Sequence, residues 1–94
     1  MAERALQDIR IVECGHLVSA AYAAKLMADM GAEVIKIEDP DHGDDTRTWG
    51  PFIDSWSSYF LGVNRSKKSV ALNLKSREGA DALRRLIERA DILV

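Results

Sequence analysis

The stretch "IRIVECGHLVSAAYAAKLMADMGAEVIKIE" (residues 9–38) predicts a strand, a helix and a second strand in succession. Residues 9–14 and 32–38 are short runs rich in isoleucine and valine, and such runs favour strands. A helix between two strands is the unit from which parallel sheets are built. We therefore expect the chain to begin with a parallel strand–helix–strand unit.

The helix of this unit is predicted over residues 20–30. Tyr22, Leu26 and Met30 recur at intervals of four, so they lie on one side of a helix and predict its apolar face. Gly31 follows directly and is placed to end the helix, because glycine adopts the left-handed conformation without steric cost.

The rest of the chain continues the alternation. Residues 39–58 hold both prolines and a cluster of acids, and we expect a long irregular loop there. Residues 69–74 ("SVALNL") predict a third strand, and residues 77–90 predict a helix with Ser76 as its amino-terminal cap. The last residues, 91–94 ("DILV"), start a fourth strand.

This order predicts an α/β fold: a Rossmann-like parallel sheet with flanking helices and right-handed crossovers. Parallel strands are buried on both faces, and a buried strand normally continues into a connecting loop. We therefore expect residues 1–94 to be the amino-terminal part of a larger domain, or a chain whose sheet another polypeptide completes.

Composition narrows the class of protein. The chain has 94 residues, 47% of them hydrophobic, which fits one globular domain and argues against disorder. Its net charge of −2 gives no overall attraction to nucleic acid or to a membrane. The single cysteine, Cys14, forms no internal disulfide, and no stretch resembles a signal peptide or a membrane span. We expect a cytoplasmic protein that binds neither nucleic acid nor a membrane.

Ligands of open parallel sheets bind outside the carboxyl ends of the strands. That rule selects three groups of residues, which are Cys14, Gly15, His16, Leu17, Val18 and Ser19, then Glu38 and Asp39, then Leu72, Asn73, Leu74, Lys75 and Ser76. Lys67 and Lys68 precede the predicted third strand, so we expect them at the opposite edge, where they serve solubility or loop anchoring. Lys75 is placed to hold a phosphate before a helix amino terminus, or is a solvated surface lysine.

Other chemistries find less support in the sequence. The first strand–helix turn has neither G-x-G-x-x-G nor a P-loop, which weakens dehydrogenase and nucleotide-hydrolase interpretations. Cys14 and His16 suggest a nucleophile and a base, but a buried thiol beside a loop imidazole is the simpler interpretation. His16, His42 and the loop acids lack metal-ligand spacing, so we expect no metal. Arg47 is expected to pair with Asp44 or Asp45 and fold the acidic loop back, or the loop is a lid over a ligand.

Two longer stretches, taken together, resemble one family. "LMADMGAEVIKIE" followed by "GDDTR", and then "YFLGVNRSKKSVALNLKS", are similar to the amino-terminal region of the class III CoA-transferases. This CaiB/BaiF-type family includes formyl-CoA transferase, carnitine CoA-transferase and α-methylacyl-CoA racemase. The resemblance covers nearly the whole chain and about the first quarter of a family member.

The resemblance implies an acyl-CoA:carboxylate CoA-transferase that passes coenzyme A from an acyl-CoA to a carboxylic acid. It implies an interlocked homodimer in the full-length form and a nucleophilic aspartate downstream of residue 94, so this segment contains no catalytic residue. It also assigns CoA contacts to Val18, Ser19, Asp39, Leu72, Asn73, Leu74 and Lys75. The sequence departs from the family at Ser19-Ala20-Ala21, where Ala-Gly-Pro is common, and at Asn73, where aspartate is usual.

Two alternatives stay open at this point. The chain is a stand-alone CoA- or nucleotide-binding module or an inactive truncated relic, or it is a fragment of an α-methylacyl-CoA racemase. The long loop after residue 38 resembles the transferases more than the racemases.

Overall fold

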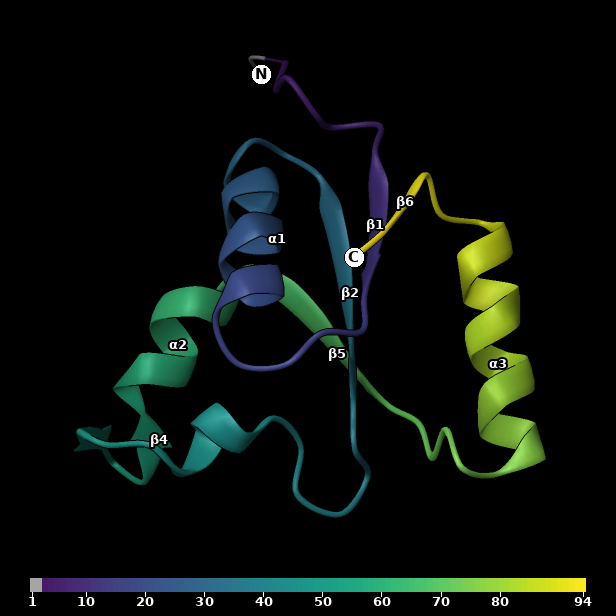
Figure 1. Ribbon diagram of the computed structural model, residues 1–94. Coiled ribbons are helices and arrows are strands. Elements are labelled where there is room, and N and C mark those ends of the chain that lie inside the picture. The colour runs from purple at the N-terminus through teal and green to yellow at the C-terminus, as the bar shows by residue number, and fades with distance from the viewer. Residues whose placement is uncertain (1–2) are drawn as a thin grey trace.

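The computed structural model describes residues 3–94 and contains a parallel sheet with helices on both faces (Figure 1). The sheet strands are β1 (Arg10–Glu13), β2 (Glu33–Glu38), β5 (Lys67–Ala71) and β6 (Ile92–Leu93). The helices are α1 (Ser19–Asp29), α2 (Ser58–Asn64) and α3 (Arg77–Glu88). Between β2 and α2 lie a short 3₁₀ helix, η1 (Asp45–Thr48), and the hairpin strands β3 (Phe52–Ile53) and β4 (Trp56–Ser57).

The four sheet strands lie in the order β5-β2-β1-β6, and every neighbouring pair is parallel. The chain steps from β1 to β2 in one direction and from β5 to β6 in the other. Right-handed crossovers therefore place α1 and α3 on opposite faces of the sheet, as Figure 1 shows. The predicted α/β fold with a parallel sheet is confirmed.

The core lies between α1 and the sheet. Side chains of β1, β2, α1 and the turn before β2 form it, together with partly buried neighbours, and its buried members are Ile11, Ala24, Ala28, Ala32 and Val34. Alanine allows a close approach of α1 to the sheet, because its side chain is a single methyl group. Gly31 has a φ of 106° and ends the helix as predicted.

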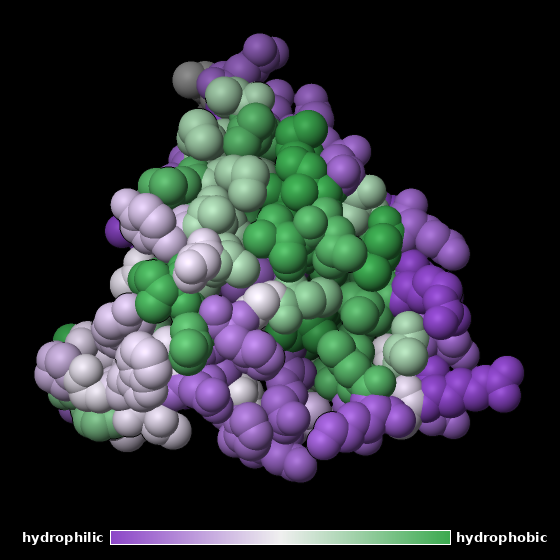
Figure 2. Space-filling model, in the orientation of Figure 1, coloured by the Kyte–Doolittle hydropathy of each residue, from purple (hydrophilic) through white to green (hydrophobic). Residues whose placement is uncertain are grey.

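The large residues predicted to form the apolar face of α1 do not face the core. Tyr22, Leu26 and Met30 are 50%, 42% and 45% exposed, whereas Ala24 and Ala28 face the core. Large apolar residues outweigh alanine in a hydrophobic pattern, but the positions of α1 that are fully buried against the sheet are alanines, with Met27 partly buried beside them. Figure 2 shows apolar side chains gathered over the middle of one molecular face, between the positions of α1 and α3.

The loop predicted over residues 39–58 is more ordered than expected. It contains η1 and the β3–β4 hairpin, and α2 follows it directly. The sequence contained a signal for α2, because Ser57 precedes an apolar run and its Oγ accepts a hydrogen bond from the backbone N–H of Phe60 at 3.1 Å. Gly62 in the middle of that run lowers its helix propensity, so a helix was not predicted there.

The third sheet strand, predicted over residues 69–74, both begins and ends earlier, and residues 72–74 lie in the turn that follows it. β5 covers Lys67–Ala71 and pairs with β2 along five positions, from Lys67 opposite Val34 to Ala71 opposite Glu38. Lys67 and Lys68 are therefore part of the strand and do not precede it. The prediction for the helix that follows is confirmed at its start, where Ser76 Oγ accepts from the N–H of Gly79 at 3.0 Å.

Candidate functional site

A cavity of about 360 Å³ lies at the carboxyl ends of β1, β2 and β5, the lower end of the strands in Figure 1. Three separate segments of the chain meet there, and the lining residues are Cys14, His16, Ile37, Glu38, Asp39, Pro40, Asp41, Leu72, Asn73, Leu74 and Lys75. The cavity thus brings together five of the seven residues predicted to contact a ligand. Topology alone selected this edge, because parallel strands present their carboxyl ends on one side of a sheet.

The loop between β1 and α1 forms one wall of the cavity. Gly15 is required there, because a Cβ atom at this position would lie 2.4 Å from the Cβ of Ala20. The close approach folds the loop against the start of α1 and leaves Cys14 and His16 in the cavity wall. Val18 and Ser19 begin α1 and do not line this cavity, so the structure does not bring these two predicted residues into it.

The second wall follows β2. Asp39 is the first residue after the strand, and its Oδ1 accepts a hydrogen bond from the backbone N–H of Asp41 at 2.8 Å. That hydrogen bond, with the positive charges of nearby groups including Lys75, lowers the pKa of Asp39 below its usual value. The Asp39 side chain is 43% exposed, so an ionised carboxylate faces the cavity and the solvent.

The third wall is the turn between β5 and α3. Asn73 organises it, since its Oδ1 accepts from the N–H of Lys75 at 3.1 Å and its carbonyl accepts from Ser76 Oγ at 2.8 Å. A Cβ atom at Gly79 would lie 1.9 Å from the Asn73 carbonyl oxygen. Glycine at position 79 therefore lets the first turn of α3 pack directly against the turn that carries Lys75, which is exposed.

A buried network of charged side chains lies beside this cavity, on the α1 face of the sheet. Glu13 accepts from Lys36 Nζ at 2.7 Å and from Lys67 Nζ at 2.6 Å, and all three side chains are at most 2% exposed. Lys67 also donates to the Ala21 carbonyl and to Asn64 Oδ1, both at 2.8 Å. Lys67 is thus an internal tie between β1, α1 and α2. Of the two predicted roles, solubility is wrong, whereas anchoring of neighbouring segments agrees with these contacts.

The two buried lysines differ in the balance of burial and charge. Burial alone would lower the pKa of Lys36, but the carboxylates of Glu13 and Asp44 outweigh it and raise that pKa. For Lys67 burial dominates over the attraction of Glu13, and its pKa is lowered. Lys36 Nζ lies 2.9 Å from Asp44 Oδ2, so the network also anchors the loop that follows β2.

Arg47 pairs with Glu38, and not with Asp44 or Asp45 as the sequence predicted. Arg47 donates from Nε and Nη2 to the two Glu38 oxygens, at 2.8 and 2.7 Å, and Ser69 Oγ and the Asp44 N–H also donate to Glu38. Burial would raise the pKa of Glu38, but these donors lower it to about 2. The carboxylate is held ionised beside the cavity by a bidentate guanidinium pair.

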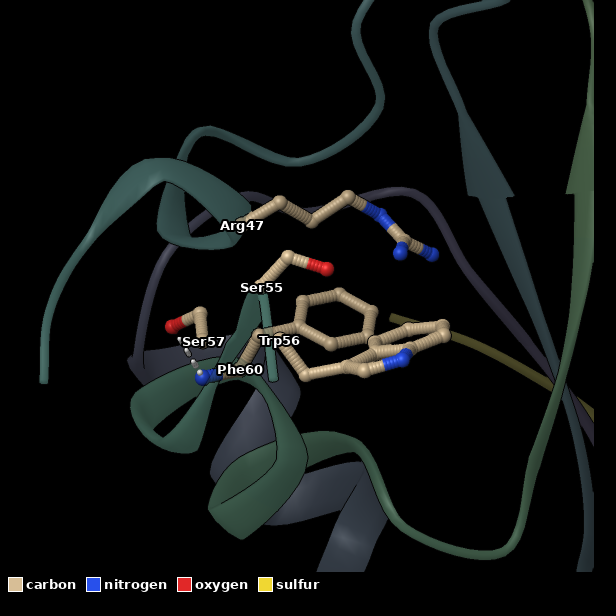
Figure 3. A pocket seen from close by; sticks show the side chains of 5 residues that line it. All are labelled: Arg47, Ser55, Trp56, Ser57 and Phe60. Carbon is tan, nitrogen blue, oxygen red and sulfur yellow. Dashed lines mark hydrogen bonds between the residues drawn. The ribbon is translucent and has the colours of Figure 1, made fainter. Parts of the chain in front are cut away.

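Aromatic packing completes the folded loop. The Arg47 guanidinium lies 3.9 Å from the centre of the Phe60 ring, and Trp49 and Tyr59 meet edge to face with centroids 5.1 Å apart. Figure 3 shows Arg47 above Phe60 and Trp56, in a second cavity of about 280 Å³ that Ser55 and Ser57 also line. This cavity is lined by the residues that hold the loop closed and contains none of the residues predicted to bind a ligand.

Cys14 is the one thiol in the wall of the first cavity. Burial and the charge of Glu13 raise the pKa of Cys14, the opposite of what a nucleophilic thiol requires. Within residues 3–94, no cluster of three or more His, Cys, Asp or Glu side chains is arranged to hold a metal ion. No helix in the same range is long and apolar enough to cross a membrane.

Comparison with known proteins identifies the family that this segment matches. Residues 6–94 match the CoA-transferase family III. The chain is 41% identical to the succinate–glutarate CoA-transferase of Agrobacterium fabrum and 43% identical to the succinyl-CoA:glutarate CoA-transferase of Mus musculus, in each case over 95% of this chain. It covers 24% and 21% of those two proteins.

A solved structure agrees with the sequence comparison. The fold superposes on a CAIB/BAIF family protein from Brucella suis with a TM-score of 0.90 and 34% identity, over 98% of this chain and 25% of that one. The chain therefore spans about a quarter of the length of the relatives that it matches.

Proposed function

Because the chain belongs to CoA-transferase family III, we propose that it is the amino-terminal part of an acyl-CoA:carboxylate CoA-transferase and forms part of that enzyme's CoA site. The substrates of the whole enzyme are then an acyl-CoA and a carboxylic acid. The two curated relatives described above are transferases by name, which supports this function over the racemase alternative.

One observation carries the proposal. The cavity at the carboxyl edge of the sheet unites Asp39 with Leu72, Asn73, Leu74 and Lys75, which are distant in sequence. Its walls are partly apolar, with an exposed lysine on one side, and this combination suits a long ligand with uncharged and phosphorylated parts. Lys75 stands at the capped amino terminus of α3, where phosphate binding is favoured.

The remaining parts of the proposal concern the rest of the enzyme. The catalytic aspartate belongs to a region that these 94 residues do not include, and it comes from the remainder of the enzyme or from a companion chain. The full-length enzyme is proposed to be a cytoplasmic homodimer. Val18 and Ser19 remain candidate CoA contacts through the backbone at the start of α1, outside the cavity.

The CoA site is tested by titrating CoA into the isotopically labelled chain and following backbone amide signals by NMR. We expect progressive shifts for residues 14–16, 39–41 and 72–76, which surround the cavity. Amides of Ser55, Trp56 and Ser57, at the second cavity, serve as the internal control and should not move. Shifts confined to that control region, or none at saturating CoA, would contradict the proposal.

The assembly is tested separately on protein isolated without a tag from its source. Size-exclusion chromatography with mass spectrometry should find these residues within, or bound to, a polypeptide several times their length. A stable monomer of 94 residues alone would support the stand-alone module instead.

A further inference from the structure

The outward side of α1 is apolar, although it faces solvent. The residues that α1 buries against the sheet are Ala21, Ala24 and Ala28. On the other side of the helix, Tyr22 and Leu26 are 50% and 42% exposed, and Met30, which follows the last turn, is 45% exposed. A helix that is apolar all round is ordinarily buried on every side. The composition of α1 is therefore that of an internal helix of a larger assembly.

The distribution of charge distinguishes α1 from α3. Within Ser19–Asp29, the exposed residues are Ser19, Tyr22, Ala23, Leu26 and Asp29. Asp29 is the one charged residue among them, and it is paired with Arg65 at 2.9 Å and with Lys25 at 3.3 Å. The exposed residues of α3 are all charged, namely Arg77, Glu78, Arg84, Arg85 and Glu88. The two helices cover opposite faces of one sheet, but only α3 presents a surface suited to water.

Extension of the sheet would leave the outward side of α1 uncovered. Within residues 3–94, β6 is the edge strand next to β1. A parallel strand added beyond β6 would continue the step from β5 to β6, and a right-handed crossover would then place its helix on the face that α3 covers. Figure 1 shows α1 on the opposite side of the sheet from α3. The element that covers α1 therefore comes from outside this series of strands and crossovers.

We propose that the outward side of α1 packs against the same side of a second copy of the chain, with the two helices running in opposite directions about a two-fold axis. This inference rests on the proposed enzyme and assigns a contact surface to its homodimer. Tyr22, Leu26 and Met30 form a ridge with a spacing of four, and the small residues Ser19 and Ala23 form the row beside it. The ridge of each copy can lie over the row of the other, which brings Tyr22 of one copy against Leu26 of the second.

The charges at the ends of α1 suit this pairing. Among residues 3–94, no side chain caps the start of α1, and its first turn contains no acidic residue, so the partial positive charge of the helix amino terminus is left without a partner. Helices that run in opposite directions bring Asp29 of each copy beside the start of α1 in the other. A stable interface takes about 20–30 residues a side, more than one helix supplies, so the chain should associate weakly by itself.

The test is sedimentation velocity of the 94-residue chain from micromolar to millimolar concentration. Leu26→Lys places a charge on the outward side of α1. Leu93→Lys is the matched control, because it places the same charge on β6, where Leu93 is 54% exposed at the edge of the sheet. Tyr22→Glu is measured alone and in an equal mixture with Leu26→Lys. Circular dichroism establishes that each variant is folded, and NMR titration with CoA follows the cavity separately.

We expect a reversible dimer for the unmodified chain and for Leu93→Lys. Leu26→Lys and Tyr22→Glu should each raise the dissociation constant about tenfold or more, because each buries a charge without a partner twice in the dimer. Their mixture should recover the dimer, since one contact then joins opposite charges and the other is the original pair.

Three results would overturn the inference. A monomer at every concentration would leave a segment from the rest of the enzyme as the element that covers α1. A dimer that Leu93→Lys weakens as much as Leu26→Lys, or more, would indicate pairing at the edge of the sheet. A mixture that stays monomeric would show that positions 22 and 26 do not meet. Loss of CoA binding by the unmodified chain would instead contradict the proposed function and leave the pairing of α1 standing.

Discussion

The Nζ atom of Lys67 lies 2.6 Å from Oε1 of Glu13, although the residues are 54 positions apart and β2 lies between their strands. Lys36 on β2 contacts the other oxygen, Oε2, at 2.7 Å. One carboxylate therefore ties three strands together beneath α1. Buried ions are costly to remove from water, so each member of such a cluster depends on its partners.

Removing the central carboxylate should destabilise the fold strongly. Glu13→Gln leaves two buried ammonium groups with one charge partner fewer, and we expect a loss of about 3–5 kcal/mol in the free energy of unfolding. Urea denaturation followed by circular dichroism measures it. Glu33→Gln is the control, because Glu33 also contacts two cations, Arg10 and Lys68, but at the surface, where such pairs contribute under about 1 kcal/mol. Equal losses would contradict a structural role for the buried cluster.

The charge at Lys75 should matter for CoA binding more than that at Lys68. Lys75→Ala removes the exposed cation at the cavity and should weaken CoA affinity about three- to tenfold at low salt. Lys68→Ala is the matched control, because its ammonium is 69% exposed and pairs with Glu33 at the far end of β5. Lys67→Ala is unsuitable as a control, since it disrupts the buried cluster. Calorimetric titration with CoA measures both affinities. An equal loss of CoA affinity in Lys75→Ala and Lys68→Ala would contradict a CoA site at the carboxyl ends of the strands.

Protonation of Glu38 at low pH should weaken the hydrogen bonds that hold the loop after β2. The pKa of Glu38 in the folded protein is about 2, against 4.5 without these partners, so its stabilising contribution is complete above pH 4.5 and is lost as the pH falls through about 2. The shift corresponds to at most about 3 kcal/mol. Unfolding measured at several pH values should show a steep loss of stability across this window. Glu38→Gln should weaken this dependence of stability on pH. An unchanged dependence in that variant would show that Glu38 does not cause it.

Two glycine-to-alanine substitutions should act in opposite directions. Gly62 lies in α2, and a methyl group at this position would meet no atom within 4 Å, so alanine there should stabilise the protein by about 0.5–1 kcal/mol. Gly79→Ala places a methyl group against the Asn73 carbonyl and should destabilise the protein and shift the amide signals of residues 72–76. Thermal unfolding and NMR of both variants measure this. Stabilisation by Gly79→Ala would show that the turn does not depend on this contact.

The register of α1 predicts a further contrast. Ala24→Leu inserts a large side chain into a position that is 0% exposed and should cost about 1–3 kcal/mol of stability. Leu26→Ala changes a half-exposed residue and should cost less than about 1 kcal/mol. Chemical denaturation distinguishes the two. A larger loss of stability for Leu26→Ala than for Ala24→Leu would indicate that Leu26 faces the core, as the spacing of large apolar residues predicted.

Local residue patterns were sufficient to predict much of the fold. The isoleucine and valine runs of β1 and β2, the helix stop at Gly31 and the cap at Ser76 were predicted because backbone geometry and local hydrogen bonds determine them. The candidate cavity followed from topology, since any parallel sheet gathers the carboxyl ends of its strands at one edge. Asp39 and residues 72–75 could be grouped without a structure for this reason.

Which side chains are internal, and what they contact, depends on the folded arrangement of the elements. The parallel α/β sheet and the edge at which a ligand is expected follow from the residue pattern, because they depend on periodicity and chain direction. The residue pattern did not determine that Lys67 is buried, that Arg47 pairs with Glu38 or that alanines and not Leu26 face the sheet. These outcomes depend on the space between layers and on partners distant in sequence, and a buried charge is stable only where the fold supplies its counter-charge.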